Sequence, residues 1–234
     1  MPGKLSHVVI SLVIAMGGIN LVFAAWEENL DIVGTVRTGE FCVKFDEGYC
    51  INYDGPGKND LNYYVYPYRD TDRCPYDVGT TYCDVEEYQV TITLENVYPC
   101  YQTFVRFKAI NCGTIPAKLK DVEVYIDDPD GLKDYVEFGV GIDVRKDGNW
   151  IGEEWYPEHW IGAFPRTDAN ITELETALEN TINAVLAKLN SDLPALPPNH
   201  ELWYDFGFHI KDGAPQKANL TITIKTIWTQ FNVQ

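Results

Sequence analysis

Residues that enzymes use as nucleophiles are scarce in this sequence. Beyond residue 25 the only serine is Ser191, and no nucleophile-elbow motif surrounds it. The chain has no glycine-rich phosphate loop, and its four histidines do not occur at a metal-binding spacing. Acidic pairs that could hydrolyse glycosides are too numerous to be informative. We therefore expect that the protein is not an enzyme.

Positive charge is scarce as well. Eighteen Lys and Arg residues stand against 35 Asp and Glu, which gives a formal charge of −17. Nucleic acids and anionic lipids require basic surfaces, so neither is an expected partner. We interpret the acidic excess mainly as solubility through self-repulsion. The cluster Asp127, Asp128 and Asp130 is a weak calcium candidate, with a plain type I turn as the favoured alternative. No other cofactor is expected.

The N-terminus has the features of a secretory signal peptide. Lys4 precedes an almost uniformly apolar run at residues 8–23, and small residues allow cleavage before Ala25. The run is short for a membrane span, and Glu27 and Glu28 follow it in place of basic residues. An uncleaved anchor and a type IV pilin leader are the less favoured alternatives. We expect residues 1–24 to be removed and the mature protein to be extracellular, without a membrane anchor.

An even number of cysteines agrees with export, because six cysteines behind a signal peptide indicate disulfides. No pair has the short spacing of a zinc knuckle. Cys100 and Cys112 flank a predicted strand whose ends lie roughly 30 Å apart, too far for a disulfide between them. Cys42 and Cys50 could pair across a turn at residues 46–48, a weak preference. The six cysteines are Cys42, Cys50, Cys74, Cys83, Cys100 and Cys112.

Alternation of apolar and polar residues dominates the chain, as is typical of half-buried strands. Turn signals such as Asp147-Gly148 and Asp212-Gly213 separate the runs. This pattern predicts an all-β, jelly-roll-like sandwich. The segment between Ile51 and Thr81 is expected to be irregular. Alternating faces occur at residues 30–36, 41–45, 88–94, 104–110, 122–126, 136–144 and 220–224.

One segment has helical spacing instead. Its apolar residues recur every three or four positions, Thr167 or Asp168 could cap its start, and Pro194 follows its end. We predict one domain, residues 25–234, with a helical insertion at about 168–190. The helical apolar face consists of Leu174, Leu178, Ile182, Val185 and Leu189.

Two features suggest contact with sugars. Asn170 and Asn219 begin glycosylation sequons, although such short motifs also occur by chance. All six tryptophans lie beyond the signal peptide, and exposed aromatic rings can stack on carbohydrate. In β-sandwich proteins, however, tryptophan lies in the core or at an interface more often than in a sugar-binding site. The tryptophans are Trp26, Trp150, Trp155, Trp160, Trp203 and Trp228.

Four segments together resemble the TasA/camelysin-like family of secreted fibre subunits, which includes the archaeal bundling pilins. They are NLDIVGTVRTGE at 29–40, VTITLENVYP at 90–99, NCGTIP at 111–116 and WTQFN at 228–232. The six cysteines and the helix depart from the bacterial members of that family.

The resemblance implies a jelly roll that polymerises by donor-strand complementation, in which the N-terminal strand of one subunit completes the sheet of the next. The donor strand would be residues 29–37, with Leu30, Ile32, Gly34 and Val36 on one face. The implied partners are identical subunits in a homopolymer, with possible lateral bundling. Alternation alone does not distinguish a strand that pairs in trans from one that pairs in cis. The alternative function is a secreted carbohydrate- or cell-surface-binding module, and a third is an acidic calcium-binding surface protein.

Overall fold

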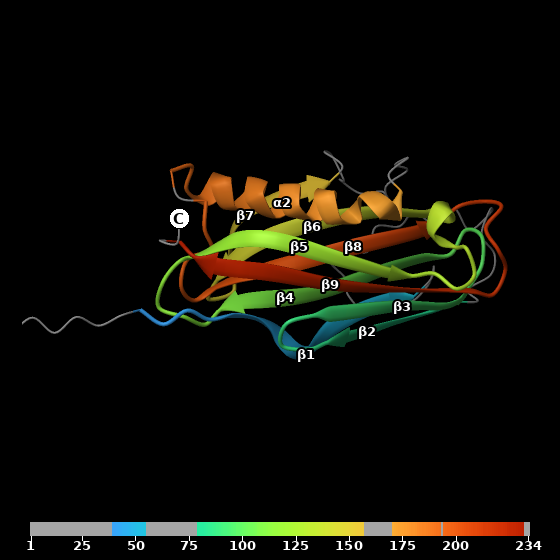
Figure 1. Cartoon of the computed structure of the whole chain (residues 1–234), viewed down its shortest axis with the longest axis horizontal. Coiled ribbons are helices and arrows are strands. Elements are labelled where there is room, and N and C mark those ends of the chain that lie inside the picture. Colours follow the sequence, from blue (N-terminus) through green and yellow to red (C-terminus); the bar gives the residue numbers. More distant parts are fainter. Residues whose placement is uncertain (1–38, 55–78, 157–169, 193, 232–234) are drawn as a thin grey trace, which may run out of the picture. The chain divides into compact units, whose positions relative to one another are not determined.

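A computed structural model describes residues 39–54, 79–156, 170–192 and 194–231, all within one compact unit, Gly39–Gln234. Within these ranges, nine strands form two antiparallel sheets, and Figure 1 shows how they are arranged. The signal peptide, the donor strand with its four face residues, and Cys74 lie outside the described residues. The strands are β1 Val43–Asp54, β2 Thr80–Val85, β3 Val90–Val97, β4 Gln102–Asn111, β5 Ala117–Asp127, β6 Val136–Lys146, β7 Asn149–Tyr156, β8 His200–Ile210 and β9 Ala218–Gln230.

The two sheets pack face to face around one apolar core. One sheet has the order β1-β4-β8-β6-β7 and the other β2-β3-β9-β5. Strands such as β3 and β4 alternate between buried and half-buried residues, because one face of each strand contacts the core. The all-β sandwich with one helical insertion that the sequence predicts is confirmed. The largest fully buried side chains include Tyr204, Phe45, Phe107, Phe138, Phe206 and Phe208.

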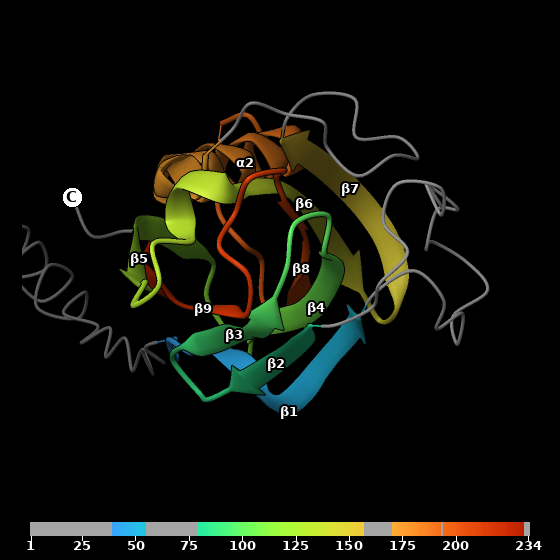
Figure 2. The ribbon, with the colours of Figure 1, turned by 90° about the vertical axis from the view of Figure 1, so that its right-hand side faces the viewer.

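The helix closes one side of the sandwich. A short 3-10 helix, η2 Ile171–Glu173, leads into α2 Leu174–Leu189. The Asn170 side chain accepts a hydrogen bond from the Thr172 N–H and caps this start; the predicted capping residues Thr167 and Asp168 lie outside the described residues. Figure 2 shows α2 between β5 and β7, the outer strands of the two sheets. Its buried face is Leu174, Ala177, Leu178, Thr181, Ile182, Val185 and Leu186.

Side chains of α2 also bind the backbone of both neighbouring strands. Glu175 accepts a hydrogen bond from the Val124 N–H of β5 at 3.0 Å. Lys188 Nζ donates to the Glu153 carbonyl of β7 at 3.1 Å. The helix therefore supplies hydrogen-bonding partners to two edges that have no further strand beside them. No helix within the described ranges is long and apolar enough to span a membrane.

The segment predicted to be irregular is strand at both ends. β1 continues to Asp54 and β2 begins at Thr80, so the interpretation of Ile51 to Thr81 was wrong at its borders. The turn expected at residues 46–48 is a bulge within β1, where the pairing with β4 shifts between Phe45 and Cys50. Gly48 has a φ of +74° and allows the extra residues to loop out.

Two disulfides join distant parts of the sandwich. Cys42 pairs with Cys112, and Cys50 pairs with Cys83. The prediction that Cys100 and Cys112 do not pair is confirmed, whereas the suggested Cys42–Cys50 pair is wrong. The physical reason is the bulge: Cys42 and Cys50 lie along one continuous strand path and not on two arms of a hairpin.

Candidate functional site

The four-stranded sheet is incomplete along half of β9. β3 pairs with β9 only from Val97↔Ala218 to Val90↔Ile224, whereas β5 pairs with β9 as far as Gln230. Figure 1 shows β9 extending beyond the turn between β2 and β3. Within the described ranges, no strand pairs with residues 225–230 on the β3 side. We call residues 225–230 the open edge of β9.

Burial changes at the start of this open edge. The inward side chain of Ile224 is 0% exposed, but the next two inward residues, Thr226 and Trp228, are only half-buried. On the neighbouring strand β5, Val122 and Leu119 remain buried at 1% and 5% exposure. The core is therefore covered on the β5 side, and its partial exposure comes from the side where β3 has ended.

The first residues of β1 show the same gradient. Phe45 is 2% exposed, Val43 is half-buried, and Phe41 is 36% exposed. The Phe45 N–H donates to the Glu87 carbonyl in the turn between β2 and β3 at 2.9 Å. Both β1 and β9 thus lose their cover at the level of this turn, where the β2–β3 hairpin stops.

The direction of the backbone groups on the open edge follows from contacts on either side. The Val124 N–H points away from β9 towards Glu175, so its partner Ile224 directs its own N–H and C=O towards β3. The Phe231 N–H points the other way, to the Pro116 carbonyl at 3.3 Å. Since these directions alternate along a strand, Thr226, Trp228 and Gln230 present their N–H and C=O groups to the open side.

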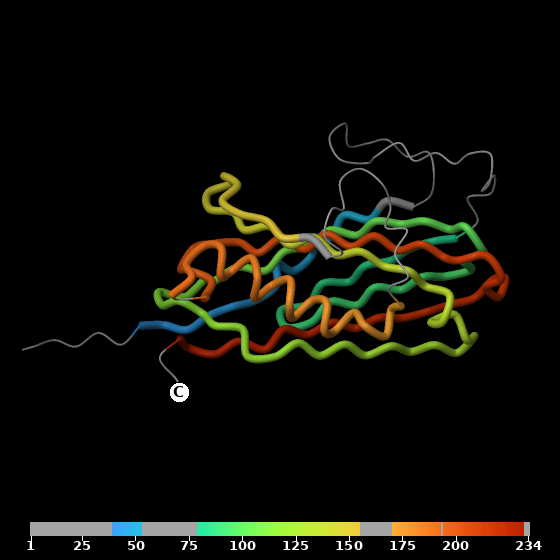
Figure 3. The backbone as a smooth tube through the Cα atoms, turned by 90° about the horizontal axis from the view of Figure 1, so that it is seen from above, coloured from blue at the N-terminus to red at the C-terminus, as the bar shows by residue number. Residues whose placement is uncertain are grey.

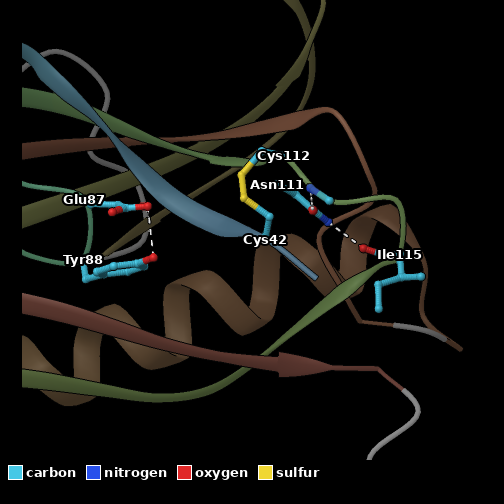
Figure 4. Close-up of a disulfide and its surroundings, with 7 residues drawn as sticks. Cys42, Glu87, Tyr88, Asn111, Cys112 and Ile115 are labelled. Atoms are coloured by element: carbon cyan, nitrogen blue, oxygen red, sulfur yellow. Dashed lines mark hydrogen bonds between the residues drawn. A yellow bond between two sulfur atoms is a disulfide. The ribbon is translucent and has the colours of Figure 1, made fainter. Parts of the chain in front are cut away.

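The chain enters the domain close to this region. Residues 40–42 pair with residues 112–114: the Gly113 N–H donates to the Cys42 carbonyl at 3.2 Å, and the Thr114 N–H to the Glu40 carbonyl at 2.8 Å. Gly113 permits the close approach, because a side chain there would collide with the Glu40 carbonyl. Figure 4 shows the Cys42–Cys112 disulfide that fixes this pairing.

The other end of β9 returns to the same connection between β4 and β5. Asn111 Nδ2 holds that connection by donating to the Ile115 carbonyl at 3.0 Å, as Figure 4 shows. Because Glu40 pairs with Thr114 and Phe231 with Pro116, the entry of the chain and the end of β9 lie at one end of the sandwich. Figure 3 shows the first described residues of the chain and the end of β9 at the same end.

A buried hydroxyl lies below the open edge. Tyr204 is fully buried, and its hydroxyl makes no hydrogen bond of normal geometry with the described residues. Burial raises the pKa of Tyr204 well above its usual value, although the Thr226 side chain lies close enough to lower this pKa in part. The neighbouring Thr226 hydroxyl accepts instead from Trp228 Nε1 at 2.9 Å. The inward polar groups at this level are therefore only partly satisfied.

The outer face of the five-stranded sheet carries an ion-pair network around Trp203. Arg106 donates twice to the buried carboxylate of Asp205, and Arg145 donates twice to Asp143. Burial raises the pKa of Asp205, an effect that the bonds from Arg106 oppose. The Arg145 guanidinium lies 4.2 Å from the centre of the Trp203 ring, so this ring already contacts a cation.

This contact bears on the sugar-binding alternative. Trp203 is engaged by the protein itself, and Trp228 is half-buried against the core. Trp150, at 60% exposure, is the one tryptophan side chain within the described set that is largely exposed. The side chains of Trp26, Trp155 and Trp160 lie outside that set. The described residues hold no group of three or more His, Cys, Asp or Glu side chains suited to a metal ion.

Two of the three calcium candidates have structural roles. Asp128 accepts hydrogen bonds from the Leu132 and Lys133 N–H groups at 2.6 and 3.2 Å and so holds the start of the 3-10 helix η1 Lys133–Tyr135. Asp130 accepts from the backbone and side chain of Asn219. Asp127 is exposed at the end of β5. These contacts match the turn interpretation more closely than an ion site.

The two sequons have different surroundings. Asn219 lies on the outer side of β9, but its amide is engaged: Nδ2 donates to Asp130 at 2.9 Å, and Oδ1 accepts from the Asn96 N–H at 3.1 Å. Asn170 uses its side-chain oxygen to cap η2. Attachment of a sugar at Asn219 would therefore have to break or reorganise a contact that joins β9 to the end of β3 and to the turn after β5.

Comparisons with known proteins do not indicate a function. No protein-family model matches the chain, and no curated protein is significantly similar to it. The open edge was not found from the sequence, although one signal was present. The alternating run that ends at Gln230 is longer than the run preceding Tyr98, and a longer strand beside a shorter one leaves part of its edge uncovered.

Proposed function

We propose that the protein is a structural subunit of an extracellular filament that polymerises head to tail through its N-terminal strand, residues 29–37. The observation that carries this proposal is the open edge of β9 in a sandwich that is otherwise closed by α2 and by two disulfides. The disulfides fit an oxidising, extracellular setting. The resemblance of residues 29–40 to fibre subunits supports the same assignment.

Strand donation would gain free energy from buried side chains and from backbone hydrogen bonds. Burial of Leu30, Ile32 and Val36 contributes roughly 5–9 kcal/mol, at about 1.5–3 kcal/mol for each side chain. Three acceptor residues with one N–H and one C=O each add up to six ladder bonds, or roughly 3–9 kcal/mol. Association costs about 4–15 kcal/mol. The side chains alone are marginal against this cost, and the ladder bonds raise the total gain to roughly 8–18 kcal/mol, so the contact depends on both contributions.

The symmetry of the contact between subunits determines whether a closed ring or an open filament forms. A donor strand on one subunit and an acceptor edge on the next are different surfaces, so the contact is heterologous. A heterologous contact that does not close into a ring yields an open filament. Subunits of the same chain are then sufficient to build the fibre.

A carbohydrate-binding module is the second candidate. The observation in its favour is the exposed Trp150, which adjoins the exposed Ile151 on β7. The engaged ring of Trp203 argues against a broad aromatic platform on the five-stranded sheet. Glycan binding by a protein that stays monomeric would favour this candidate over the filament.

Electron microscopy of the purified mature protein tests the filament proposal. We expect long polymers from the unaltered chain and soluble monomers from Ile32→Asp, because a charge would enter the buried face of the donor strand. Thr35→Asp is the matched control, since it places the same charge on the opposite face. Polymers that persist in Ile32→Asp would contradict strand donation.

A further inference from the structure

We propose that the open edge of β9 is the acceptor site for the N-terminal strand of a second copy, with Gly34 of the donor placed against Trp228 of the acceptor. The inference rests on the proposed function and adds where the strand binds and in which register. It is carried by the pairing of β9, by the exposure of its inward side chains and by the direction of its backbone groups.

Other outer edges of the two sheets have protein groups on them. On β5, Asp121 accepts from the Val122 N–H, Glu175 from the Val124 N–H, and Leu196 pairs with Ala117. On β7, Lys188 donates to the Glu153 carbonyl. A strand that bound either edge would have to displace these contacts.

β1 and β2 lie against each other at the remaining side. The Cys50–Cys83 disulfide joins them, and Asn52 Nδ2 donates to the Thr81 carbonyl. The stretch of β9 past Ile224 differs from all of these, because there the core side chains themselves are partly exposed. Binding at β9 would cover apolar surface and would displace none of the helices and strands that the structure describes.

The dimensions of donor and acceptor agree. The acceptor spans six residues, 225–230, and the donor face from Leu30 to Val36 spans seven, about 23 Å in extended form. Its third position on the inward face is Gly34. A glycine opposite a large aromatic residue leaves room for the ring to lie across the neighbouring strand. Trp228 is the large inward residue of the open edge, which sets the register.

The same strand is poorly placed to reach the open edge of its own copy. Residues 40–42 run along residues 112–114, so a strand in cis would have to reverse direction at Thr38 and Gly39. Gly39 is packed so closely against Ile115 that a Cβ there would collide with the isoleucine side chain. A donor strand that kept the direction of residues 40–42 would instead lead beyond the end of the domain, where a second copy can take it up.

Photo-crosslinking in the full-length mature protein tests the site. A benzophenone amino acid replaces Thr226, whose backbone groups face the open side and whose half-buried side chain lies on the inward face that the donor would cover. In the control it replaces Tyr125, which is 54% exposed on the outer face of the same sheet. Equal amounts of ¹⁵N-labelled and unlabelled protein are mixed before assembly. Tryptic digestion then releases a donor peptide that ends at Arg37.

We expect position 226 to crosslink to the donor peptide, with labelled and unlabelled copies joined, and position 125 not to do so. Filaments without crosslinks from position 226 would overturn the acceptor site and leave the filament proposal intact. Crosslinks confined to single copies would overturn the second copy as occupant. Monomers that show no crosslink would contradict both proposals.

A pair of substitutions tests the register independently. Gly34→Leu should abolish most sedimentable polymer, because the new side chain meets Trp228. Gly34→Leu with Trp228→Ala should restore polymer, with circular dichroism used to confirm that each monomer is folded. Normal assembly of Gly34→Leu alone, or no recovery in a folded double variant, would overturn the pairing of these two residues.

Discussion

Removal of the Cys42–Cys112 disulfide gives the sharpest test of how the domain is held together. The two cysteines are 70 residues apart in sequence, and the bond restricts that loop in the unfolded chain. For a loop of this length, the chain-entropy relation gives about 4 kcal/mol at 25 °C. In a domain of this size, 1 kcal/mol shifts the melting temperature by about 2–4 °C. Cys42→Ala with Cys112→Ala should therefore lower the melting temperature by about 8–16 °C.

The assay is thermal and guanidinium unfolding of the double variant beside the unaltered protein. Cys50→Ala with Cys83→Ala is the comparison, with a shorter loop of 33 residues and a smaller expected loss of about 3.7 kcal/mol if it acts alone. A loss below about 1 kcal/mol in the Cys42 variant would refute this reasoning. Such a result would mean that the hydrogen bonds of Gly113 and Thr114 suffice to hold the entering chain.

Other predictions concern stability, pH and salt. Asp205→Asn should destabilise by roughly 3–5 kcal/mol in urea, because it leaves Arg106 buried without a counter-charge; Arg106→Met with Asp205→Leu should recover most of that loss. Tyr204→Phe should change stability by less than about 0.5 kcal/mol or increase it by about 1 kcal/mol, since the hydroxyl makes no hydrogen bond of normal geometry, and a clear loss would reveal a hidden one. Burial opposes ionisation of Glu201, but hydrogen bonds, chiefly from Lys108, outweigh it and hold the pKa of Glu201 below its usual value. Its contribution is therefore present at neutral pH and lost as pH falls through that lowered pKa, and Glu201→Gln should show a smaller acid-induced loss of stability in a pH series. Because the chain carries a formal charge of −17, sedimentable polymer should increase as NaCl rises from about 0.01 M to about 0.1 M, where screening shortens from about 30 Å to about 10 Å.

Most of the fold could be predicted because its strands have one buried face. The runs that ended as β3, β4, β5 and β6 alternate clearly and were recognised. β8 was missed, because residues 205–208 are buried on both faces of the strand and the alternation is lost. β7 was missed because Gly152 and two glutamates interrupt its pattern. Burial on both faces depends on neighbours that a single sequence does not specify.

Only the donor half of the proposed site was expected from the sequence. Residues 29–37 alternate and follow the predicted signal peptide, so a strand was expected there; this expectation stays a prediction, because these residues lie outside the described part of the chain. The acceptor depends on where β3 ends relative to β9, which is a matter of register between segments more than 120 residues apart. Likewise, the Cys42–Cys112 pair could not be deduced, because a bulge at residues 46–48 replaced the hairpin that favoured Cys42–Cys50.

The open edge of β9 also explains the position of the Cys42–Cys112 disulfide. Residues 39–43 border the part of the core that the β2–β3 hairpin leaves uncovered, so they have strand-like partners on one side only. A terminal segment held on one side frays easily, since few contacts oppose its opening. The Cys42–Cys112 disulfide stands at this point and prevents the loss of that border. In the proposed filament, a pull on the donor strand would act on the hydrogen bonds of Glu40 and then on the disulfide. The disulfide would pass it to Cys112, directly after β4, an inner strand of the five-stranded sheet. Under the proposed function, the edge has to stay open to receive a strand, and the covalent link at Cys42 would hold its border in place.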